Sequence, residues 1–340
     1  MAIDGGLASL SESLWTAATG TYMLAVVAYT GEYAFGKNGR IAQTSAAQAG
    51  VRQPTLVGGG EPGAVGALPD QPRYGAGSVD SGGAAGRRWG RAAVWLTVLA
   101  AVFHLGSVTL RGIAVDRVPW GNMYEFTLVV GLMATVAWLA TLVKMPQLRY
   151  LGLFVMMPVL LVMFLAGTLY TKATKLVPAL QSWWLAIHVS AVAVAEGILL
   201  TSAAITVLYL VRVRFERQGA TGATPARFAR LGARLPAAAS LDKAAYLSVA
   251  FAFPIYTAGV IFGAIWAEAA WGRYWGWDPK ETWAFIAWVI YATYLHARAT
   301  AGWKGNRAAY INLLGFGAMT FNFFVVNIVI SGLHSYAGLT

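Results

Sequence analysis

The segment WLAIHVSAVAVAEGILLTSAAITVLYLV (184–211) contains a single charged residue, Glu196. A helix needs about 20 predominantly apolar residues to cross the hydrocarbon core of a bilayer, and this segment is long enough to do so. The whole chain has the same character, because 58% of its 340 residues are hydrophobic and only 11% are charged. Soluble domains carry about 25% charged residues. The sequence therefore predicts an integral membrane protein built from helices.

Further apolar stretches of spanning length occur along the chain, near 14–35, 92–113, 123–143, 150–170, 244–266, 283–302 and 309–331. The first of them is the weakest, because Glu32, Gly20 and several threonines dilute it. We therefore expect an all-α polytopic membrane protein with about eight transmembrane helices. We expect no cleavable signal peptide, because the acidic start MAIDGGLASLSES lacks the positive charge that such a peptide carries.

The basic residues predict an orientation in the membrane. Alternate connections hold 19 of the 25 lysines and arginines, in 36–91, 144–149, 212–243 and 298–307. Because Lys and Arg are enriched in cytoplasmic loops, this side is predicted to be cytoplasmic and both termini extracytoplasmic. The net charge of +11 is then a topology signal, and no nucleic-acid partner is expected.

Composition divides the chain into three parts. We expect an N-terminal transmembrane helix at 1–35, a flexible cytoplasmic tether at 36–91 and a helical core at 92–340. The tether is rich in Gly, Ala and Gln, so it contains too little apolar surface to fold alone. A second basic connection contains RFARLGARL (227–235), which suits a short helix lying on the anionic inner leaflet.

The external connection after the sixth helix reads WGRYWGWDPKETWAF (271–285). Asp278 suits an N-cap, Pro279 suits the first helical position, and Glu281 stands where a capping box needs its acid. This interpretation makes Asp278 and Glu281 structural residues, and it predicts that asparagine is tolerated at position 278.

The tryptophans of this connection need a further explanation. An interfacial aromatic belt accounts for two or three rings. Six aromatic side chains surround this one loop: Trp266, Trp271, Tyr274, Trp275, Trp277 and Trp283. A large planar apolar ligand explains them better, and Arg273 and Lys280 would meet its acidic groups through charge-assisted hydrogen bonds.

Two of the four histidines are expected at the level of this loop. His188 lies about 7 Å below the external end of the fifth helix by helix rise, and His334 follows the external end of the eighth. Two neutral imidazoles beside an aromatic platform fit the axial ligands of haem. His104, in the second helix, is more simply a residue bonded to a neighbouring helix, and a role as a second ligand stays open.

These motifs together resemble a known family. The stretch at 271–285 resembles the WWD signature of haem-handling proteins in cytochrome c maturation. Further segments resemble the System II branch, of the CcsA/ResC/CcsB type: PWGNMYE (119–125), WWLAIHV (183–189), YLHAR (294–298) and GLHSYAG (332–338). The resemblance covers roughly 100–338.

The resemblance implies a membrane component of a cytochrome c synthase. Such a protein works with a ResB-type membrane partner, moves haem b as a transported substrate across the plasma membrane, and presents it on the extracytoplasmic face. There the haem meets the thiols of a Cys-x-x-Cys-His motif in apocytochrome c. The chain has no cysteine, which agrees with thiols supplied by that substrate. Haem lyase activity is expected only in complex with the partner.

The resemblance also assigns site residues. His188 and His334 would be the external iron ligands, and His296 would ligate haem in transit, about 20 Å below the outer surface by helix rise. An external WWD loop at 266–283 would clasp the macrocycle, through Trp271, Arg273, Trp275, Trp277, Asp278, Lys280 and Trp283.

Three polar or aromatic groups keep more than one interpretation. Glu196 lies about 18 Å deep by helix rise, near the level of His296, so a hydrogen bond between them is open. In VPWGNMYE (118–125), Asn122 and Glu125 form a second candidate capping box. Trp120 and Tyr124 of this segment are candidates to extend the outer aromatic surface.

Two functions of other classes compete with this interpretation. A secondary transporter would explain Glu196 but not the aromatic loop. A quinone-reactive b-type cytochrome subunit would place its histidine pairs inside the bundle, whereas two of these four histidines are expected at the outer surface. An absorption spectrum of the purified protein discriminates between them, because the synthase component should bind haem through His188 and His334.

Overall fold

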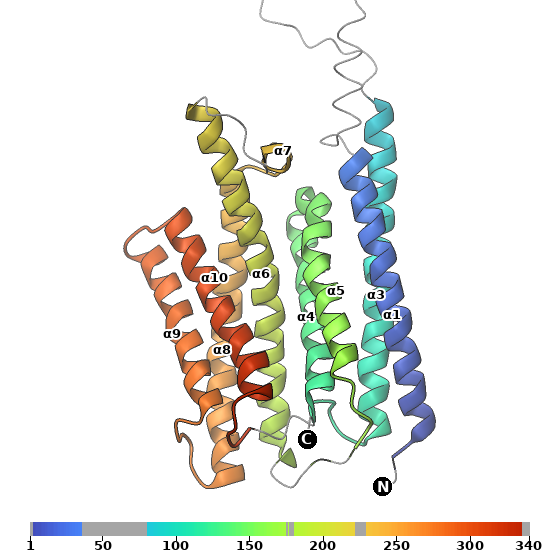
Figure 1. Cartoon of the computed structure of the whole chain (residues 1–340), viewed down its shortest axis with the longest axis vertical. Helices are drawn as coiled ribbons and strands as arrows, with labels where there is room; N and C mark the ends of the chain where they lie inside the picture. Colours follow the sequence, from blue (N-terminus) through green and yellow to red (C-terminus); the bar gives the residue numbers. More distant parts are fainter. Residues whose placement is uncertain (1–2, 36–79, 175, 177–179, 222–228, 335–340) are drawn as a thin grey trace, which may run out of the picture.

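The computed structural model describes residues 3–35, 80–174, 176, 180–221 and 229–334, and every regular element in these ranges is helical. Long helices run up and down side by side (Figure 1). The predicted all-α membrane fold is thereby confirmed. Residues 36–79 of the expected tether lie outside the described residues, and residues 80–91 form the start of a helix.

One side of the bundle contains the N-terminal helices. α1 (Gly5–Phe35) and α3 (Asp80–Ala114) pack along their length. They are followed by α4 (Met123–Lys144), the short 3-10 helix η1 (Pro146–Leu151) and α5 (Gly152–Thr168). Glu32, which diluted the first apolar stretch, is buried and pairs with Arg149 of η1 at 2.6 Å.

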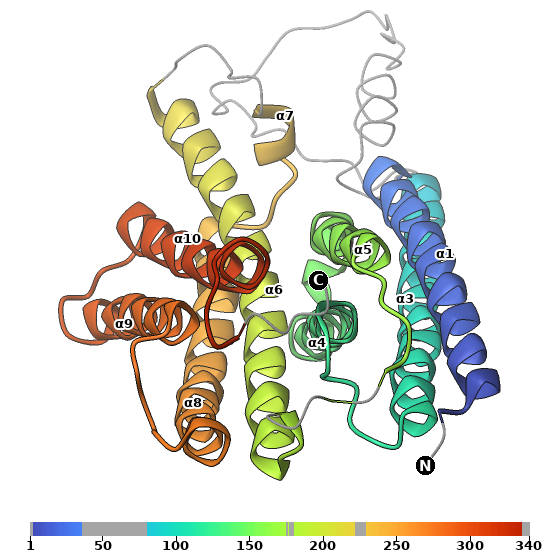
Figure 2. The ribbon, with the colours of Figure 1, turned by 60° about the horizontal axis from the view of Figure 1, so that its bottom comes forward.

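The other side contains α6 (Trp183–Thr221), the short α7 (Ala229–Gly232), α8 (Ala238–Trp271) and α9 (Pro279–Ala299). It ends with α10 (Asn306–Phe321), which continues into the π-helical turn η3 (Asn322–Val326). α6 packs on α8 and also contacts α4, α5 and α10, so it joins the two sides (Figure 2). α7 falls inside the segment that was expected to form a short helix, although residues 227–228 of that segment lie outside the described residues.

Six helices of the described chain are long and apolar enough to cross a membrane. They correspond to α3, α4, η1 with α5, α6, α8, and α10 with η3. α1 and α9 are helices at the predicted positions but fall outside this group. Threonines and glycines lower the hydropathy of the first, and Lys280, Glu281, His296 and Arg298 lower that of the second. The chain is a multi-pass membrane protein, and eight spans remain an expectation.

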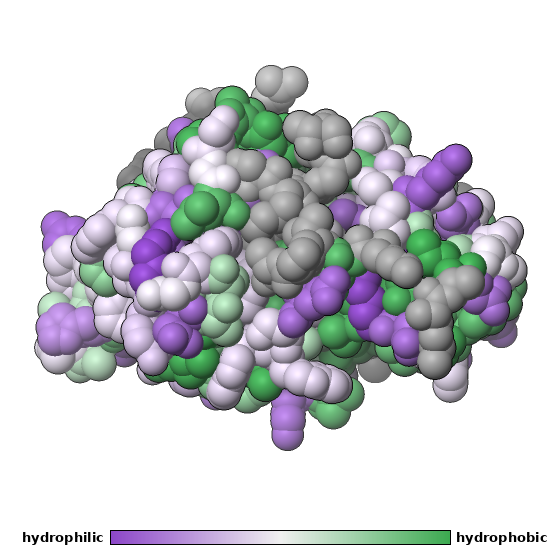
Figure 3. All heavy atoms as spheres, turned by 90° about the horizontal axis from the view of Figure 1, so that it is seen from below, coloured by the Kyte–Doolittle hydropathy of each residue, from purple (hydrophilic) through white to green (hydrophobic). Residues whose placement is uncertain are grey.

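The described connections lie at two ends of the bundle. The α4–α5 and α9–α10 connections and the end of α6 lie at the upper end of the bundle in Figure 1. The α3–α4 and α8–α9 connections and the start of α1 lie at the lower end. The arginine-rich and lysine-rich segments at 144–149 and 298–307 are therefore on one side. The expected aromatic loop is on the other, and Figure 3 shows that hydrophobic and hydrophilic side chains both reach this lower face.

The start of α4 is fixed by a buried ion-pair cluster. Asn122 caps the helix, because its side chain accepts a hydrogen bond from the Glu125 amide at 2.9 Å. The Glu125 carboxylate accepts from the Gly121 amide at 2.8 Å and pairs with Arg111 at 3.0 Å and Arg117 at 2.8 Å. Only the Asn122 half of the predicted capping box therefore forms, because the buried carboxylate is used on these donors instead.

His104 contacts the neighbouring helix α1. It is fully buried in α3, and its Nδ1 lies 3.3 Å from the hydroxyl of Tyr22 in α1. This contact agrees with the interpretation of His104 as a residue bonded to a neighbouring helix. Tyr124 is also fully buried, so it does not extend the outer aromatic surface.

Candidate functional site

The connection between α8 and α9 is held by its own carboxylate. Glu281 accepts hydrogen bonds from the backbone amides of Asp278 at 3.1 Å and Gly276 at 2.8 Å, and it pairs with Arg273 at 3.1 Å. Together with Asp278 it forms the predicted capping box of α9. Trp277 takes a left-handed backbone conformation with φ 59°, which only a few per cent of non-glycine residues adopt.

Asp278 does more than cap α9. Its Oδ2 accepts from the Lys280 amide at 3.2 Å and from His334 Nδ1 at 2.8 Å, and its Oδ1 accepts from the Leu333 amide at 2.7 Å. A Cβ atom on Gly332 would lie 2.7 Å from Oδ1, so a side chain there would disturb this approach. Burial raises the pKa of Asp278, but the hydrogen bonds from His334 and Leu333 outweigh it and lower the pKa to about 2. The carboxylate is therefore ionised at neutral pH.

His188 is oriented by a backbone carbonyl. Its Nδ1 lies 2.7 Å from the Gly259 oxygen of α8. A carbonyl only accepts hydrogen bonds, so this contact assigns the proton to Nδ1 and the lone pair of the neutral ring to Nε2. A Cβ atom on Gly263 would lie 2.7 Å from His188 Cε1, so the absence of a side chain gives the imidazole its place against α8.

The ring of His334 is oriented in the same way, but by a side-chain carboxylate. The Asp278 carboxylate accepts from its Nδ1, so the neutral ring carries its lone pair on Nε2. Burial lowers the pKa of His334, and the neighbouring Asp278 opposes this shift. Both histidines therefore have a hydrogen-bond acceptor behind Nδ1, which is the arrangement that orients histidine ligands in metal sites.

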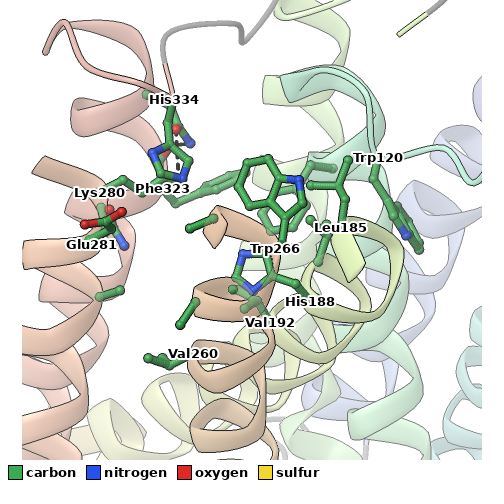
Figure 4. Close-up of a pocket in the computed structure, with 18 of the residues that line it drawn as sticks. Trp120, Leu185, His188, Val192, Val260, Trp266, Lys280, Glu281, Phe323 and His334 are labelled. Carbon is green, nitrogen blue, oxygen red and sulfur yellow. Dashed lines mark hydrogen bonds between the residues drawn. The ribbon is translucent and has the colours of Figure 1, made fainter. Parts of the chain in front are cut away.

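Trp266 connects the two histidines. Its ring lies nearly parallel to that of His188, with centroids 6.1 Å apart, and edge-on to that of His334 at 5.7 Å. Trp271 approaches both Trp266 at 4.8 Å and His334 at 5.0 Å. Figure 4 shows His188 and His334 converging from different segments on either side of the Trp266 indole. The expectation that His188 and His334 share one level is thus in accord with the structure.

These residues line one cavity between α4, α6, α8, α9 and η3. The space between its atoms, including solvent at the open mouth, is about 1190 Å³. Its lining includes both histidines together with Trp266, Trp271, Trp275, Lys280 and Glu196. Of these, Glu196 was predicted only as an intramembrane acid, because helix rise placed it about 18 Å deep, well below the loop.

Other predicted contacts lie outside the cavity lining. The Trp277 ring is 65% exposed and meets Trp275 edge-on at 5.7 Å. Trp283 packs on Phe321 of α10 at 4.2 Å, and Arg273 is bound to Glu281. Trp120 is part of the cavity lining, but its ring points away from the histidines (Figure 4).

His296 is far from this cluster. It stands in the last turn of α9, at the opposite end from the aromatic loop, and its side chain is exposed. It shares an exposed stripe of α9 with Phe285 and Val289. Within the described residues it makes no hydrogen bond to Glu196, whose side chain lines the cavity instead.

The arrangement suits a planar apolar molecule that contains a metal. Two imidazoles can offer their Nε2 atoms, aromatic rings can cover a macrocycle, and a single lysine supplies positive charge. Haem iron accepts histidine ligands in this way, and second-shell acceptors on Nδ1 raise the basicity of such ligands. The residues present therefore fit haem.

Comparison with known proteins agrees with this geometry. The profile of the cytochrome c assembly protein family matches residues 120–334, which include both histidines and the loop. The cytochrome c biogenesis protein CcsA of Guillardia theta is 36% identical over 259 residues, covering 72% of this chain and 84% of that protein. CcsA of Heterosigma akashiwo is 36% identical over 253 residues, covering 65% and 77%, and CcsA of Synechococcus elongatus is 37% identical over 199 residues, covering 48% and 61%. This chain belongs to the cytochrome c assembly protein family and is a multi-pass membrane component of cytochrome c biogenesis.

Proposed function

We propose that this chain is the haem-presenting component of a System II cytochrome c synthase. In this proposal it receives haem b as a substrate, holds it at the extracytoplasmic face of the plasma membrane, and presents it to apocytochrome c. One observation carries the proposal: His188 of α6 and His334 beyond η3 meet at one cavity, each with its Nδ1 bound to an acceptor.

The residues of the chain supply binding and orientation. Bound haem brings two vinyl groups, and each thiol of a Cys-x-x-Cys-His motif adds across one of them to give a thioether. His188 and His334 would ligate the iron through Nε2, with Gly259 and Asp278 fixing the two rings. The chain contributes no thiol, since it has no cysteine. Lyase activity in this proposal belongs to the complex with a ResB-type partner.

The proposal includes a second haem station at His296. Iron takes two axial ligands, and His188 and His334 supply both at the outer station. His296 lies at the other end of α9, so it would serve a different haem. Its exposed side chain needs a covering partner within a bilayer, because an uncovered polar group there is costly. A helix of the ResB-type protein on the stripe of Phe285, Val289 and His296 would provide it.

The test measures covalent attachment of haem to apocytochrome c. The chain is co-expressed with its ResB-type partner and an apocytochrome in a host that lacks its own maturation system, and covalent haem is detected by gel staining. His188→Ala and His334→Ala should each abolish covalent haem while the protein stays inserted. Added imidazole should partly restore it by filling the vacated ligand position. Lys172→Met, an exposed change outside the cavity, is the control. Normal cytochrome c in either histidine variant would refute the assignment.

A further inference from the structure

The cavity has one basic side chain in its described lining. Lys280 stands in the first turn of α9, and its Nζ donates to Asn327 Oδ1 at 2.9 Å. The sequence offered Arg273 as a second cation for an acidic ligand. The guanidinium of Arg273 is instead bound to Glu281, and Arg273 does not line the cavity. The positive charge that a ligand meets inside the cavity is therefore that of Lys280.

The two carboxylic side chains that line the cavity, Glu281 and Glu196, also differ in whether they are already bound by other groups of the protein. Glu281 is occupied by Arg273 and by the amides of Gly276 and Asp278. Glu196, two turns further along α6 than His188, is 6% exposed and makes no hydrogen bond or ion pair to another described residue. Lys280 and Glu196 both line the cavity, and in the described part of the chain no ion pair joins their side chains. They face a shared space, which is the cavity itself.

The other walls of the cavity differ in polarity. Apolar side chains line the side formed by α4, the start of α6 and the segment before it, with Met123, Phe126, Leu180, Leu185 and Val189. On the other side α9 contributes Lys280. η3 contributes Asn322 and Asn327, together with Phe323, whose ring packs on Phe126 of α4 with centroids 4.9 Å apart. Figure 4 shows Lys280 and Leu185 on opposite sides of Trp266. A planar ligand with one acidic edge and one apolar edge would match this division.

We propose that Lys280 binds a carboxylate of the cavity's ligand and thereby fixes the orientation of the ligand in its own plane. This inference rests on the proposed function, because haem has its two carboxylates on one edge and its vinyl groups on another part of the ring. The acidic edge lies towards α9 and η3, and the apolar part of the ring lies towards α4 and α6.

The test compares haem with haem dimethyl ester, which keeps the ring and iron but has no free carboxylate. Both are titrated into the purified chain with its partner, and binding is followed by absorption. Lys280→Met should weaken haem binding about tenfold or more, because a charge-assisted hydrogen bond is lost, and leave ester binding within about twofold. Lys280→Arg should restore most of the haem affinity. Lys172→Met makes the same chemical change at an exposed position outside the cavity and should alter neither ligand.

Thermal unfolding of each variant checks that the fold is kept.

The outcomes separate the two proposals. If Lys280→Met weakens haem and ester equally, or weakens neither, the carboxylate role is wrong while haem binding stands. If the wild-type complex binds neither haem nor ester, the proposed function fails and takes this inference with it.

Discussion

Replacing Asp278 with asparagine separates its two roles. As an N-cap, asparagine is about as good as aspartate, so a residue that only capped α9 would tolerate the change. The structure gives the carboxylate three donors, at 2.8 Å from His334 Nδ1, 2.7 Å from the Leu333 amide and 3.2 Å from the Lys280 amide. An amide has one acceptor oxygen in place of two, and its NH₂ group would face a donor.

The size of the effect follows from the lost bond. A hydrogen bond to a charged group contributes about 1.5–3 kcal/mol, and each 1.4 kcal/mol is about tenfold in an equilibrium constant. The pKa of Asp278, lowered to about 2, is a sign of comparable stabilisation of the carboxylate form. Loss of a second-shell partner costs about 10–100-fold in metal affinity in other sites. We therefore expect Asp278→Asn to weaken haem binding by about 10–100-fold while α9 stays folded.

Haem titration of the purified variant measures this loss, with circular dichroism as the check on helix content. Asp242→Asn is the matched control, because Asp242 also binds a side chain, Arg298 at 2.7 Å, but does not line the cavity. Its haem affinity should equal that of the wild type. If Asp278→Asn binds haem with wild-type affinity, Asp278 is only a cap and the His334 contact carries no function.

Three further predictions follow from the same geometry. Trp275→Ala should strongly lower haem content, measured by absorption, because Trp275 lines the cavity. Trp277→Gly should keep the haem content and raise the unfolding temperature in a thermal scan, because glycine suits a φ of 59°. Equal haem loss in both variants would refute this prediction. His296→Ala should lower haem occupancy at the outer site in the complex with the partner by blocking supply; wild-type occupancy would make it a packing residue. Burial lowers the pKa of His334, so its ring stays neutral at pH values below the usual histidine pKa of about 6.5. Haem affinity should therefore be nearly constant from pH 7.5 to about 6 and fall at lower pH. A midpoint of this fall at or above pH 6.5 would contradict the prediction.

Local features of the fold were readable from the sequence. Apolar stretches predicted the helices, and the order Asp-Pro-Lys-Glu predicted the capping box of α9, because both depend on neighbours in the chain. Helix rise placed His188 at the level of the loop. The bond between Asp278 and His334 was not predicted, since the two residues are 56 positions apart and a cap already explained the aspartate.

The direction of each side chain was the second feature that the sequence did not predict. Six aromatic residues around one loop predicted a single cluster, but only some of them line the cavity. Trp277 and Trp283 have the same chemistry as Trp275, yet one ring points outward and the other packs on α10. Arg273 and Lys280 are likewise both basic residues of the loop region, and their difference comes from which carboxylate lies within reach. Composition does not contain that information, because it depends on the packing of distant helices.

The starts of α4 and α9 show how a ligand-orienting residue can arise on a structural frame. In each, a Trp-Gly pair precedes the cap, and a glutamate binds the glycine amide and an arginine, through Glu125 in one and Glu281 in the other. This arrangement places a balanced carboxylate at a helix N-terminus, where the helix dipole favours it. Two differences distinguish the second copy. One residue, Trp277, is inserted after the glycine and takes the left-handed conformation, and the cap is aspartate in place of asparagine. Asn122 has one acceptor oxygen, which the cap uses, whereas Asp278 has a second oxygen and a full charge left for Leu333 and His334. The aspartate cap therefore lets the start of α9 also hold a histidine, through the contact between Asp278 and His334.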